Sequence, residues 1–379
     1  MKELSESRIL IVDDVPANVD VLVQALRGEY QLSVAIDGTS ALRTAEKLLP
    51  DLVLLDIMMP GIDGYEVCRR LRASAQTREI PVMFLSSLED VQDKTKGFEA
   101  GGNDYLVKPF EVLEVKARVK SLLRAKAYAD AVKEKIAYDL RIAREIQMGI
   151  LPPDIAAVAE GTGLEAHAVL HPAQEVGGDL YEVLKTPDGN VVVVMGDVSG
   201  KGIPAALFMA VTTTLVRAMA PESHRANEIL RRVSDALVSH NPRNMFVTVL
   251  CGIYDVVTGQ LEYASAGHPP AVLVRDGKAT LLPTEPDMAA GIQAGLSAPS
   301  QSVQLQAGDL VVFYTDGVTE AFNAAGELYG ETRLLEELTG HSGYTAAEST
   351  AALLRHVRAH AGDHPQSDDI AILALKRKR

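Results

Sequence analysis

Aspartates stand at the ends of short apolar runs in this chain, and they fall into two clusters. The first cluster comprises Asp13, Asp14 and Asp56. The second comprises Asp179, Asp197, Asp316 and Asp368. A carboxylate at the edge of a buried strand is unfavourable unless a cation or hydrogen bonds compensate its charge. The pattern therefore predicts two metal-dependent phosphate sites in one chain, as expected of a signalling enzyme.

Composition limits the classes of protein that this chain can represent. The 379 residues are 47% hydrophobic and 23% charged, enough for two or three domains with ordinary cores. The net charge of −14 argues against a nucleic-acid partner, whose phosphates require a basic surface. Cys68 and Cys251 fall in different predicted domains, so no disulfide framework or cysteine zinc site is expected. With neither a signal peptide nor an apolar run of about 18 residues, we expect a cytoplasmic protein without a membrane partner. The basic residues 376–379 are expected to form a solvated tail.

Residues 8–125 alternate short apolar runs with amphipathic stretches, which predicts an α/β fold with a parallel sheet. Ligands of such sheets bind beyond the carboxyl ends of the strands, where the first acid cluster lies. Carboxylates brought together repel one another, and Mg²⁺ relieves that repulsion. Asp56 could then accept a phosphoryl group as a nucleophile, with its charge neutralised by the metal and Lys108. Ser86 could donate a hydrogen bond to a phosphate oxygen.

The order of Asp-Asp, Asp-x-x-x-Pro, Ser and Lys-Pro on four successive strands resembles the receiver domain of two-component response regulators. The resemblance implies a doubly wound, flavodoxin-like, five-stranded parallel sheet and phosphorylation of Asp56 by a histidine kinase or another phosphodonor. It implies a Mg²⁺ ion held by Asp13, Asp14, Asp56 and the carbonyl of Met58. It further implies phosphate contacts from Ser86 and Lys108 and an aromatic switch at Tyr105. The alternative is a receiver fold that has lost phosphorylation.

Residues 111–150 contain no proline and a single glycine, and their apolar positions recur at intervals of three and four. This pattern predicts a long helix that ends at Leu151-Pro152-Pro153. The apolar register slips near 122–126, where Lys126 occupies the expected seam position. We expect the seam to join two subunits as a coiled coil, which makes the protein a homodimer through this linker helix. The alternative is a last receiver helix followed by a separate capping helix, each packed on its own domain.

Residues 154–379 contain many short β-rich runs, interrupted by helical patterns near 203–219, 225–239 and 345–361. Strands with segregated helices predict an α+β domain, here a β-sandwich flanked by helices. The stretch 284–302 is expected to be a mobile loop. The predicted organisation is therefore a domain over 1–124, a helical linker over 125–150 and a second domain over 151–379.

The second acid cluster has the composition of a site for two hard cations. Asp197 and Asp316 end apolar runs, Asp368 precedes one, and Asp179 follows two glycines that let the backbone approach a metal closely. Oxygen-only ligands favour Mg²⁺ or Mn²⁺ over zinc. Four acids suit a pair of ions about 3.5–4 Å apart, which activates water and holds a phosphate for in-line displacement.

Five strings occur in order: VGGDLYEV, GDVSGKGIPAAL, SAGHPPA, YTDGVTEA and SDDIAIL. Together they resemble the metal-dependent (PPM-type, protein phosphatase 2C-like) serine/threonine phosphatases, specifically their bacterial SpoIIE-like branch. The segment AREIQMGILPPD over 143–154 resembles the one that precedes this domain in the family. The similarity covers about residues 143–376.

This second resemblance implies a role for each matching residue. Two Mn²⁺ or Mg²⁺ ions would be held by Asp179, Asp197, the Val198 carbonyl, Asp316 and Asp368. The family pattern places the ligand first in its Asp-Asx pair, which favours Asp368 over its neighbour. Supporting residues around the ligands would be Asp369, Gly178 and Gly200. We expect His268 to be a turn or packing residue rather than a catalytic acid. Eukaryotic relatives carry a His beside the bridging Asp and an upstream phosphate-binding Arg, and this chain has neither.

The two resemblances predict a response regulator in which phosphorylation of Asp56 controls a serine/threonine phosphoprotein phosphatase. They imply that the substrate is an anti-sigma-factor antagonist of the STAS type, in a partner-switching pathway. The alternative is a non-enzymatic adaptor whose phosphatase-like domain only binds protein. The sequence does not fix whether phosphorylation activates or inhibits.

Overall fold

The chain forms two compact units, Met1–Tyr138 and Asp139–Arg379, which divide within one long helix. The computed structural model describes residues 4–87, 91–239, 241, 243–285 and 287–378, with only the backbone described over 91–94. The dividing helix, α5 (Val112–Ile150), is continuous. The long linker helix is therefore confirmed, and the alternative of two separate helices is wrong.

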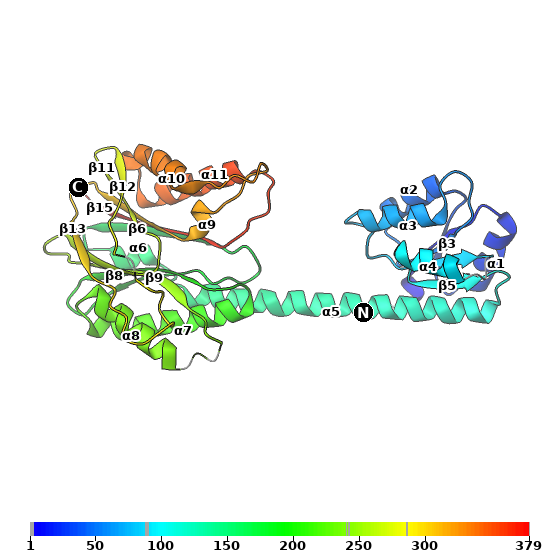
Figure 1. Cartoon of the computed structure of the whole chain (residues 1–379), viewed down its shortest axis with the longest axis horizontal. Coiled ribbons are helices and arrows are strands. Elements are labelled where there is room, and N and C mark those ends of the chain that lie inside the picture. The colour runs from blue at the N-terminus through cyan, green and yellow to red at the C-terminus, as the bar shows by residue number, and fades with distance from the viewer. Residues whose placement is uncertain (1–3, 88–90, 240, 242, 286, 379) are drawn as a thin grey trace. The chain divides into compact units, whose positions relative to one another are not determined.

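The first unit is a parallel sheet with helices on both faces, as the α/β prediction required (Figure 1). Its five strands lie in the order β2-β1-β3-β4-β5. One face packs on α2 and α3, and the other packs on α1 and the start of α5. The elements are η1 (Leu4–Glu6), β1 (Arg8–Val12), α1 (Pro16–Leu26), β2 (Gln31–Ala35), α2 (Gly38–Leu48), β3 (Leu52–Asp56), α3 (Gly64–Ala73), β4 (Val82–Ser86), α4 (Val91–Glu99) and β5 (Asp104–Val107).

Burial explains which strands of this sheet could be predicted from the sequence. Every residue of β3 and β4 is buried, because both strands are covered on two faces, and both therefore appear as continuous apolar runs. Strand β2 lies at the sheet edge, where Ala35 is its one buried residue. Its residues consequently form no apolar run, and this strand could not be predicted separately.

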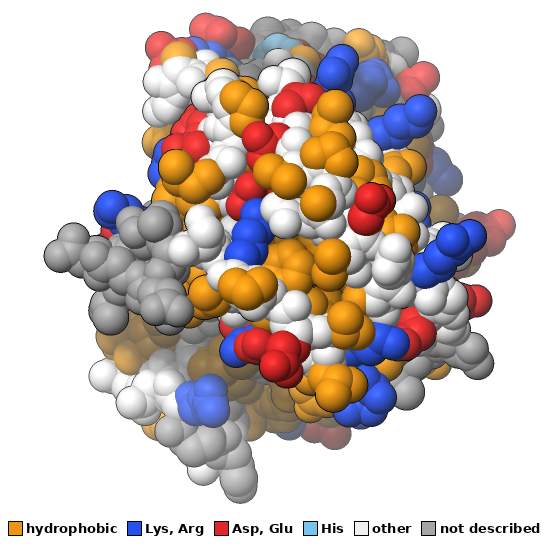
Figure 2. Space-filling view, turned by 90° about the vertical axis from the view of Figure 1, so that its right-hand side faces the viewer, with side chains coloured by type: hydrophobic (Ala, Val, Ile, Leu, Met, Phe, Trp, Pro, Cys, Tyr) orange, Lys and Arg blue, Asp and Glu red, His pale blue; other side chains and the backbone are white. Residues whose placement is uncertain are grey.

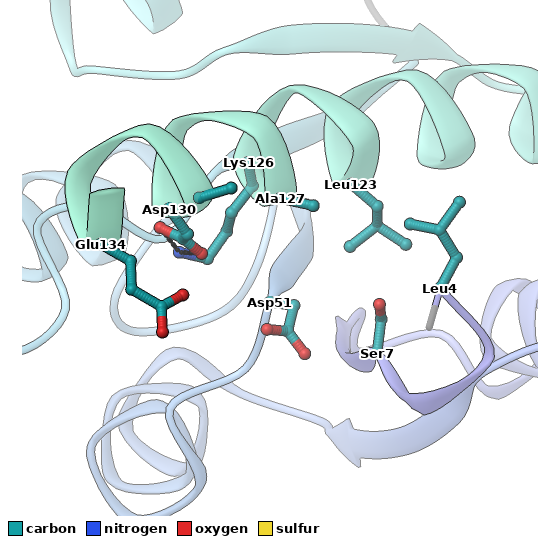
Figure 3. Close-up of a pocket in the computed structure, with 9 residues that line it drawn as sticks. Leu4, Ser7, Asp51, Leu123, Lys126, Ala127, Asp130 and Glu134 are labelled. Carbon is teal, nitrogen blue, oxygen red and sulfur yellow. Dashed lines mark hydrogen bonds and ion pairs between the residues drawn. The ribbon is translucent and has the colours of Figure 1, made fainter. Parts of the chain in front are cut away.

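Helix α5 buries apolar side chains against the first unit in its first turns, and Lys133 further along forms an ion pair with Glu79. Val115, Val119 and Leu123 are buried there. A cavity of about 180 Å³ follows, between this helix and the segments around Ser7 and Asp51 (Figure 3). Lys126, the residue at the expected seam position, lines this cavity and pairs with Asp130 across one helical turn, with Nζ 3.0 Å from Oδ2. The register slip in the sequence thus marks the place where the buried face of the helix ends.

The second unit stacks two antiparallel sheets between two layers of helices (Figure 1). The strand orders are β13-β10-β9-β8-β7 and β12-β11-β14-β15-β6. One core lies between the sheets, a second under α7 and α8, and a third under α9, α10 and α11. This arrangement confirms the predicted β-sandwich flanked by helices. The elements are α6 (Ile155–Ala159), β6 (Leu164–His171), β7 (Leu180–Lys185), β8 (Val191–Val198), α7 (Ile203–Met219), η2 (Ala220–Glu222), α8 (Ala226–Ser239), β9 (Val247–Tyr254), β10 (Gln260–Ala266), β11 (Val272–Arg275), β12 (Lys278–Leu281), β13 (Gln301–Gln304), β14 (Leu310–Tyr314), α9 (Asp316–Thr319), α10 (Gly330–Thr339), η3 (Gly340–Gly343), α11 (Ala346–Ala361) and β15 (Ile370–Arg377).

Two segments expected to be irregular contact the rest of the fold. Within 287–302, Ala290 exchanges two backbone hydrogen bonds with Val247 and Leu296 is buried in the core. The small residues of this stretch suggested mobility, but small residues also allow a loop to pack closely on a sheet. Lys376 and Arg377 belong to strand β15 rather than to a solvated tail, and Lys376 Nζ donates to the Ser342 carbonyl at 3.2 Å. Arg379 lies outside the described residues.

Two further features of the fold concern surface and core chemistry. The segment Ile203–Glu222, which contains α7, is long and apolar enough to cross a membrane by length and composition. In this fold it covers a sheet of the second unit with part of its surface.

Cys68 and Cys251 are fully buried free thiols, one in each unit, and burial raises the pKa of both.

Candidate functional site

Three carboxylates meet at the carboxyl ends of β1 and β3 in the first unit. Asp13 directly follows β1 and Asp56 ends β3, so the parallel pairing of these strands brings them together. Oxygens of Asp13, Asp14 and Asp56 all lie within 4.8 Å of one another. Burial raises the pKa of Asp56; the charges of Asp13 and Asp14 add to this effect, while Lys108 opposes it. The cluster is a suitable site for one hard divalent cation.

Lys108 supplies a positive charge to this cluster. Its Nζ lies 2.7 Å from Asp13 Oδ2 and 2.9 Å from Asp56 Oδ1. Burial alone would lower the pKa of Lys108, but hydrogen bonds to both carboxylates raise it overall. Asn18 on α1 donates from Nδ2 to both oxygens of Asp13, at 3.0 and 3.2 Å. Sequence reasoning missed Asn18, because nothing distinguishes it from the other polar residues of an amphipathic helix.

The remaining residues predicted for the first site lie around the same sheet edge. Ser86 is buried at the end of β4, and its carbonyl accepts a hydrogen bond from the Lys108 amide at 2.7 Å. Tyr105 is buried, with its ring centroid 5.4 Å from that of Phe84. It packs on Gly97, where an added Cβ would come within 1.3 Å of the tyrosine hydroxyl.

Figure 2 shows the side of the first unit on which α5 begins, where apolar side chains are interspersed with charged ones. The Met58 side chain is 64% exposed, so its backbone carbonyl, rather than its side chain, is the group relevant to a cation.

The second cluster draws its acids from both sheets of the second unit. Asp197 lies near the end of β8 in one sheet, whereas Asp316 follows β14 and Asp368 precedes β15 in the other. Burial, and then the charges of Asp316 and Asp368, raise the pKa of Asp197 to about 7. The charges of Asp316 and Asp368, from the opposite sheet, thus act on Asp197.

Asp179 is the most deeply buried acid of this group, with 2% of its surface exposed. Burial and the charge of Asp197 raise its pKa well above the ordinary value. The hydroxyl of Thr315 donates to Asp179 Oδ2 at 2.7 Å and accepts from the Ala371 amide at 2.9 Å. Thr315 therefore ties the carboxylate to strands β14 and β15. Sequence reasoning missed this residue, although it directly precedes Asp316.

The two neighbouring acids at the start of β15, Asp368 and Asp369, have different contacts. Asp369 accepts the Ala173 amide at 2.8 Å and the Gly178 amide at 2.6 Å, so both of its oxygens hold the backbone. Asp368 instead forms an ion pair with Lys201, whose Nζ lies 2.9 Å from Oδ2. This difference supports the predicted preference for Asp368 as a ligand and Asp369 as a supporting residue.

Glycines make the close approach of these segments possible. An added Cβ would lie 2.0 Å from Asp369 Oδ2 at Gly177 and 2.8 Å from the Val198 carbonyl oxygen at Gly178. At Gly317 it would lie 1.8 Å from the carbonyl oxygen of Asp369. Gly200 adopts a φ of +88°, which favours glycine. Gly178 and Gly200 were the two positions that the sequence predicted to shape the site.

The donor set of the second cluster fits divalent cations. Its ligand atoms are oxygens, and burial raises the pKa of Asp179, Asp197 and Asp316. Over the part of the chain that the structure describes, Lys201 is the single basic side chain in an ion pair with the cluster. Several clustered carboxylates with one partly exposed lysine leave negative charge that bound cations would neutralise. Sequence reasoning noted the Ser-Gly-Lys-Gly segment but assigned Lys201 no role.

His268 is fixed beneath this site and has the geometry of a packing residue. Its Nδ1 lies 2.9 Å from the Thr248 hydroxyl and its Nε2 lies 3.1 Å from the Tyr314 carbonyl oxygen. Burial lowers its pKa to about 4, so the ring is neutral near pH 7. Both ring nitrogens are therefore engaged within the protein.

Comparisons with known proteins agree with the two sites. The family model described as Stage II sporulation protein E (SpoIIE) matches residues 187–378, and the response regulator receiver domain model matches residues 9–120. The chain belongs to the SpoIIE family and carries a response regulator receiver domain in its first unit.

Individual relatives match one or both units. Response regulator PleD of Caulobacter vibrioides is 44% identical over 137 residues, which cover 36% of this chain and 30% of the relative. Protein IcfG of Synechocystis is 28% identical over 292 residues, covering 69% of this chain and 44% of the relative. The SiaA-PP2C domain of Pseudomonas aeruginosa has a TM-score of 0.58 and 25% identity, over 65% of this chain and 98% of that domain. The chain thus spans less than half the length of PleD and of IcfG. Its combination of a receiver domain with a SpoIIE domain fits a regulated phosphatase.

Proposed function

We propose that this chain is a response regulator whose output is a metal-dependent serine/threonine phosphoprotein phosphatase. The observation that carries the proposal is the convergence of four acids from both sheets of the second unit, where burial and mutual repulsion raise the pKa of Asp179, Asp197 and Asp316. An adaptor that only binds protein has no need for such a cluster, which costs folding free energy without a ligand.

In the proposed phosphatase site, two Mn²⁺ or Mg²⁺ ions are held by Asp179, Asp197, Asp316, Asp368 and the carbonyl of Val198. When bound, such a pair activates water and neutralises charge on a phosphoryl group. Thr315 orients Asp179 through its hydrogen bond. Lys201 is 45% exposed beside Asp368, so its ammonium group is available at the rim for an incoming phosphate oxygen. It supplies a cation in a family branch that lacks the phosphate-binding Arg of eukaryotic relatives.

In the proposed receiver, a histidine kinase or another phosphodonor phosphorylates Asp56. The Asp13, Asp14 and Asp56 carboxylates, with the Met58 carbonyl, hold a Mg²⁺ ion, and Ser86 and Lys108 contact the phosphoryl group. Tyr105 is the proposed switch residue, because its hydroxyl lies against Gly97 of α4 and its ring contacts Phe98 of the same helix. The added charge alters the contacts of this sheet edge, and α5 begins a few residues beyond Lys108.

The proposed substrate is a phosphorylated anti-sigma-factor antagonist of the STAS type, and the proposed location is the cytoplasm. Both follow from the likeness of the second unit to the SpoIIE branch. Apolar side chains of α5 beyond Leu123, including Val132 and Ile136, are exposed, which supports pairing of two chains through this helix.

Phosphate release from a candidate phosphorylated antagonist tests the proposal. We expect release in the presence of Mn²⁺, a different rate after acetyl phosphate treatment, and no response to acetyl phosphate in Asp56→Asn. Asp316→Asn should abolish release, whereas Asp363→Asn, a matched change at an exposed acid, should leave it intact. Release that survives chelation and is unaltered in Asp316→Asn would contradict a metal-dependent phosphatase. A complete lack of turnover with any divalent ion would favour the adaptor.

A further inference from the structure

The last turns of α5 bury a polar residue at a position where a helix that docks on a domain normally buries an apolar one. Among residues 139–150, all of which the structure describes, Gln147 is the one buried side chain, with 5% of its surface exposed. Its neighbours Ile146 and Met148 are 62% and 39% exposed. Burying an amide is unfavourable unless its donor and acceptor find partners.

Gln147 finds both partners in a single residue, Gly177, which precedes the acid cluster of the second unit. Its Nε2 donates to the Gly177 carbonyl oxygen at 2.6 Å, and its Oε1 accepts from the Gly177 amide at 3.2 Å. The side-chain amide thus pairs with Gly177 as a neighbouring strand would. A leucine of similar size would fill the same volume but would leave two buried backbone groups without partners.

The segment that Gln147 holds leads directly into the most buried acid of the cluster. Gly177 has no room for a Cβ because the carboxylate of Asp369 lies against it. The next amide, that of Gly178, donates to Asp369 Oδ2 at 2.6 Å. Asp179 follows, fixed by Thr315. The backbone before Asp179 is therefore held by hydrogen bonds from Gln147 to Gly177 and from the Gly178 amide to Asp369.

The end of α5 is itself fixed to the second unit. The Arg217 guanidinium donates to the Ile150 carbonyl and pairs with Glu182, its Nε 2.6 Å from Oε2. Leu151, the next residue, is buried in the core under α7 and α8. A rotation or shift of the last turns of α5 therefore changes the position of Gln147 relative to Gly177.

We infer that Gln147 is a positioning residue through which α5 sets the geometry of the 177–179 segment and hence its affinity for divalent cations. This inference rests on the proposed metal site. Residues that hold the ligands of a metal typically alter its affinity by 10–100-fold when they are replaced. The linker helix thereby contributes a contact to the site, in addition to connecting the two units.

The test compares Gln147→Leu with Glu145→Leu, a change from polar to apolar at an exposed position two residues away in the same full-length chain. Mn²⁺ binding is measured by titration calorimetry, and backbone amide exchange of residues 173–180 is measured by mass spectrometry without metal. We expect Gln147→Leu to weaken Mn²⁺ binding about 10-fold and to speed exchange at 173–180, since the Gly177 amide loses its acceptor. Glu145→Leu should match the unmodified chain in both measurements.

Each other outcome has a defined meaning. Mn²⁺ binding by Gln147→Leu that equals that of the unmodified chain would overturn the role of Gln147 and leave the proposed phosphatase site standing. An equal loss in Glu145→Leu would also overturn it. Failure of the unmodified chain to bind Mn²⁺ would overturn the metal site itself. If Gln147→Leu does not fold, Gln147→Glu replaces it, because glutamate keeps the size and an acceptor but cannot donate to the Gly177 carbonyl while ionised.

Discussion

Burial and the charges of neighbouring acids raise the pKa of both Asp179 and Asp197, which favours a protonated carboxyl in this buried pair when no cation is bound. In the absence of a cation, that proton is what makes the pair tolerable in a buried position. Cation binding requires its release, so metal affinity and proton affinity oppose each other at this site. The protonation of single residues is therefore part of the stability of the metal-free protein.

The first prediction concerns the pH dependence of that stability. The folded pKa of Asp197, about 7, is raised above its ordinary value of 3.8, so its contribution to stability is greatest below pH 4 and is lost as the pH rises through 7. In chelator, Asp197→Asn should therefore raise the free energy of unfolding at pH 8 by at least about 1 kcal/mol. The gain should be smaller at pH 5. Urea denaturation at both pH values provides the measurement.

The exposed change Asp363→Asn is the control for this comparison and should have no pH-dependent effect. An effect of Asp197→Asn that is the same at pH 5 and pH 8 would show that the carboxylate is not protonated in the metal-free fold.

The residues that could be predicted at this scale share one property. Asp13, Asp56, Asp197 and Asp316 each follow or end an apolar strand, so local sequence alone places them at a sheet edge. Asn18, Thr315 and Gln147 act through contacts with residues distant in sequence, and no local pattern reports such contacts. Gln147 belongs to a string that the sequence singled out, but its partner Gly177 is 30 positions away.

At the scale of secondary-structure elements, the phosphatase site depends on how closely the first turn of α9 approaches the start of β15. Asp316, a proposed ligand, begins that turn, and Gly317 follows it and faces the backbone of Asp369. The distance between the two segments is therefore limited by the lack of a side chain at this single position.

The second prediction follows from this close approach. Gly317→Ala should lower the free energy of unfolding by about 1–3 kcal/mol, because the Cβ would overlap the Asp369 carbonyl and force α9 and β15 apart. It should also weaken Mn²⁺ binding, because both segments carry proposed ligands. Urea denaturation and titration calorimetry are the measurements.

Gly340→Ala is the matched control, since Gly340 has a φ of −75° and no atom within 4 Å of an added Cβ. It should leave both quantities near their original values. A Gly317→Ala variant that is as stable as Gly340→Ala would contradict the close packing of α9 on β15.

Helices and strands could be predicted where their burial requires a recognisable pattern of apolar residues in the sequence. Strands β3, β8 and β14 are almost entirely buried and appear as apolar runs, and helix α7 was placed at its observed bounds. Strands β12 and β13 lie at sheet edges, with few buried residues, and neither was identified. The long loop before β13 was judged by its composition alone, whereas its structure depends on pairing with β9.

At the scale of the whole molecule, α5 is the element shared by both units. Side chains of its first turns and that of Gln147 are buried, whereas Val132 and Ile136 are exposed between them. The part of the predicted seam that includes Val132 and Ile136 is therefore exposed in one chain, and pairing with a second chain would bury it.

The third prediction tests this pairing. Ile136→Glu should weaken self-association about 10-fold or more, because a charge replaces an apolar side chain in the seam. Lys135→Glu, one position away on the same helix and also exposed, should have a much smaller effect. Sedimentation equilibrium with and without a phosphoryl mimic gives the association constants. An unmodified chain that is monomeric in both states would exclude the dimer.

The two buried cysteines have a practical consequence for studying this two-unit chain. Thiol reagents attack the thiolate, and burial disfavours that form at Cys68 and Cys251 alike. Alkylation must therefore wait until the surrounding core opens. Since Cys68 belongs to the first unit and Cys251 to the second, peptide mass spectrometry after timed labelling would read the opening of each unit separately, without any engineered probe.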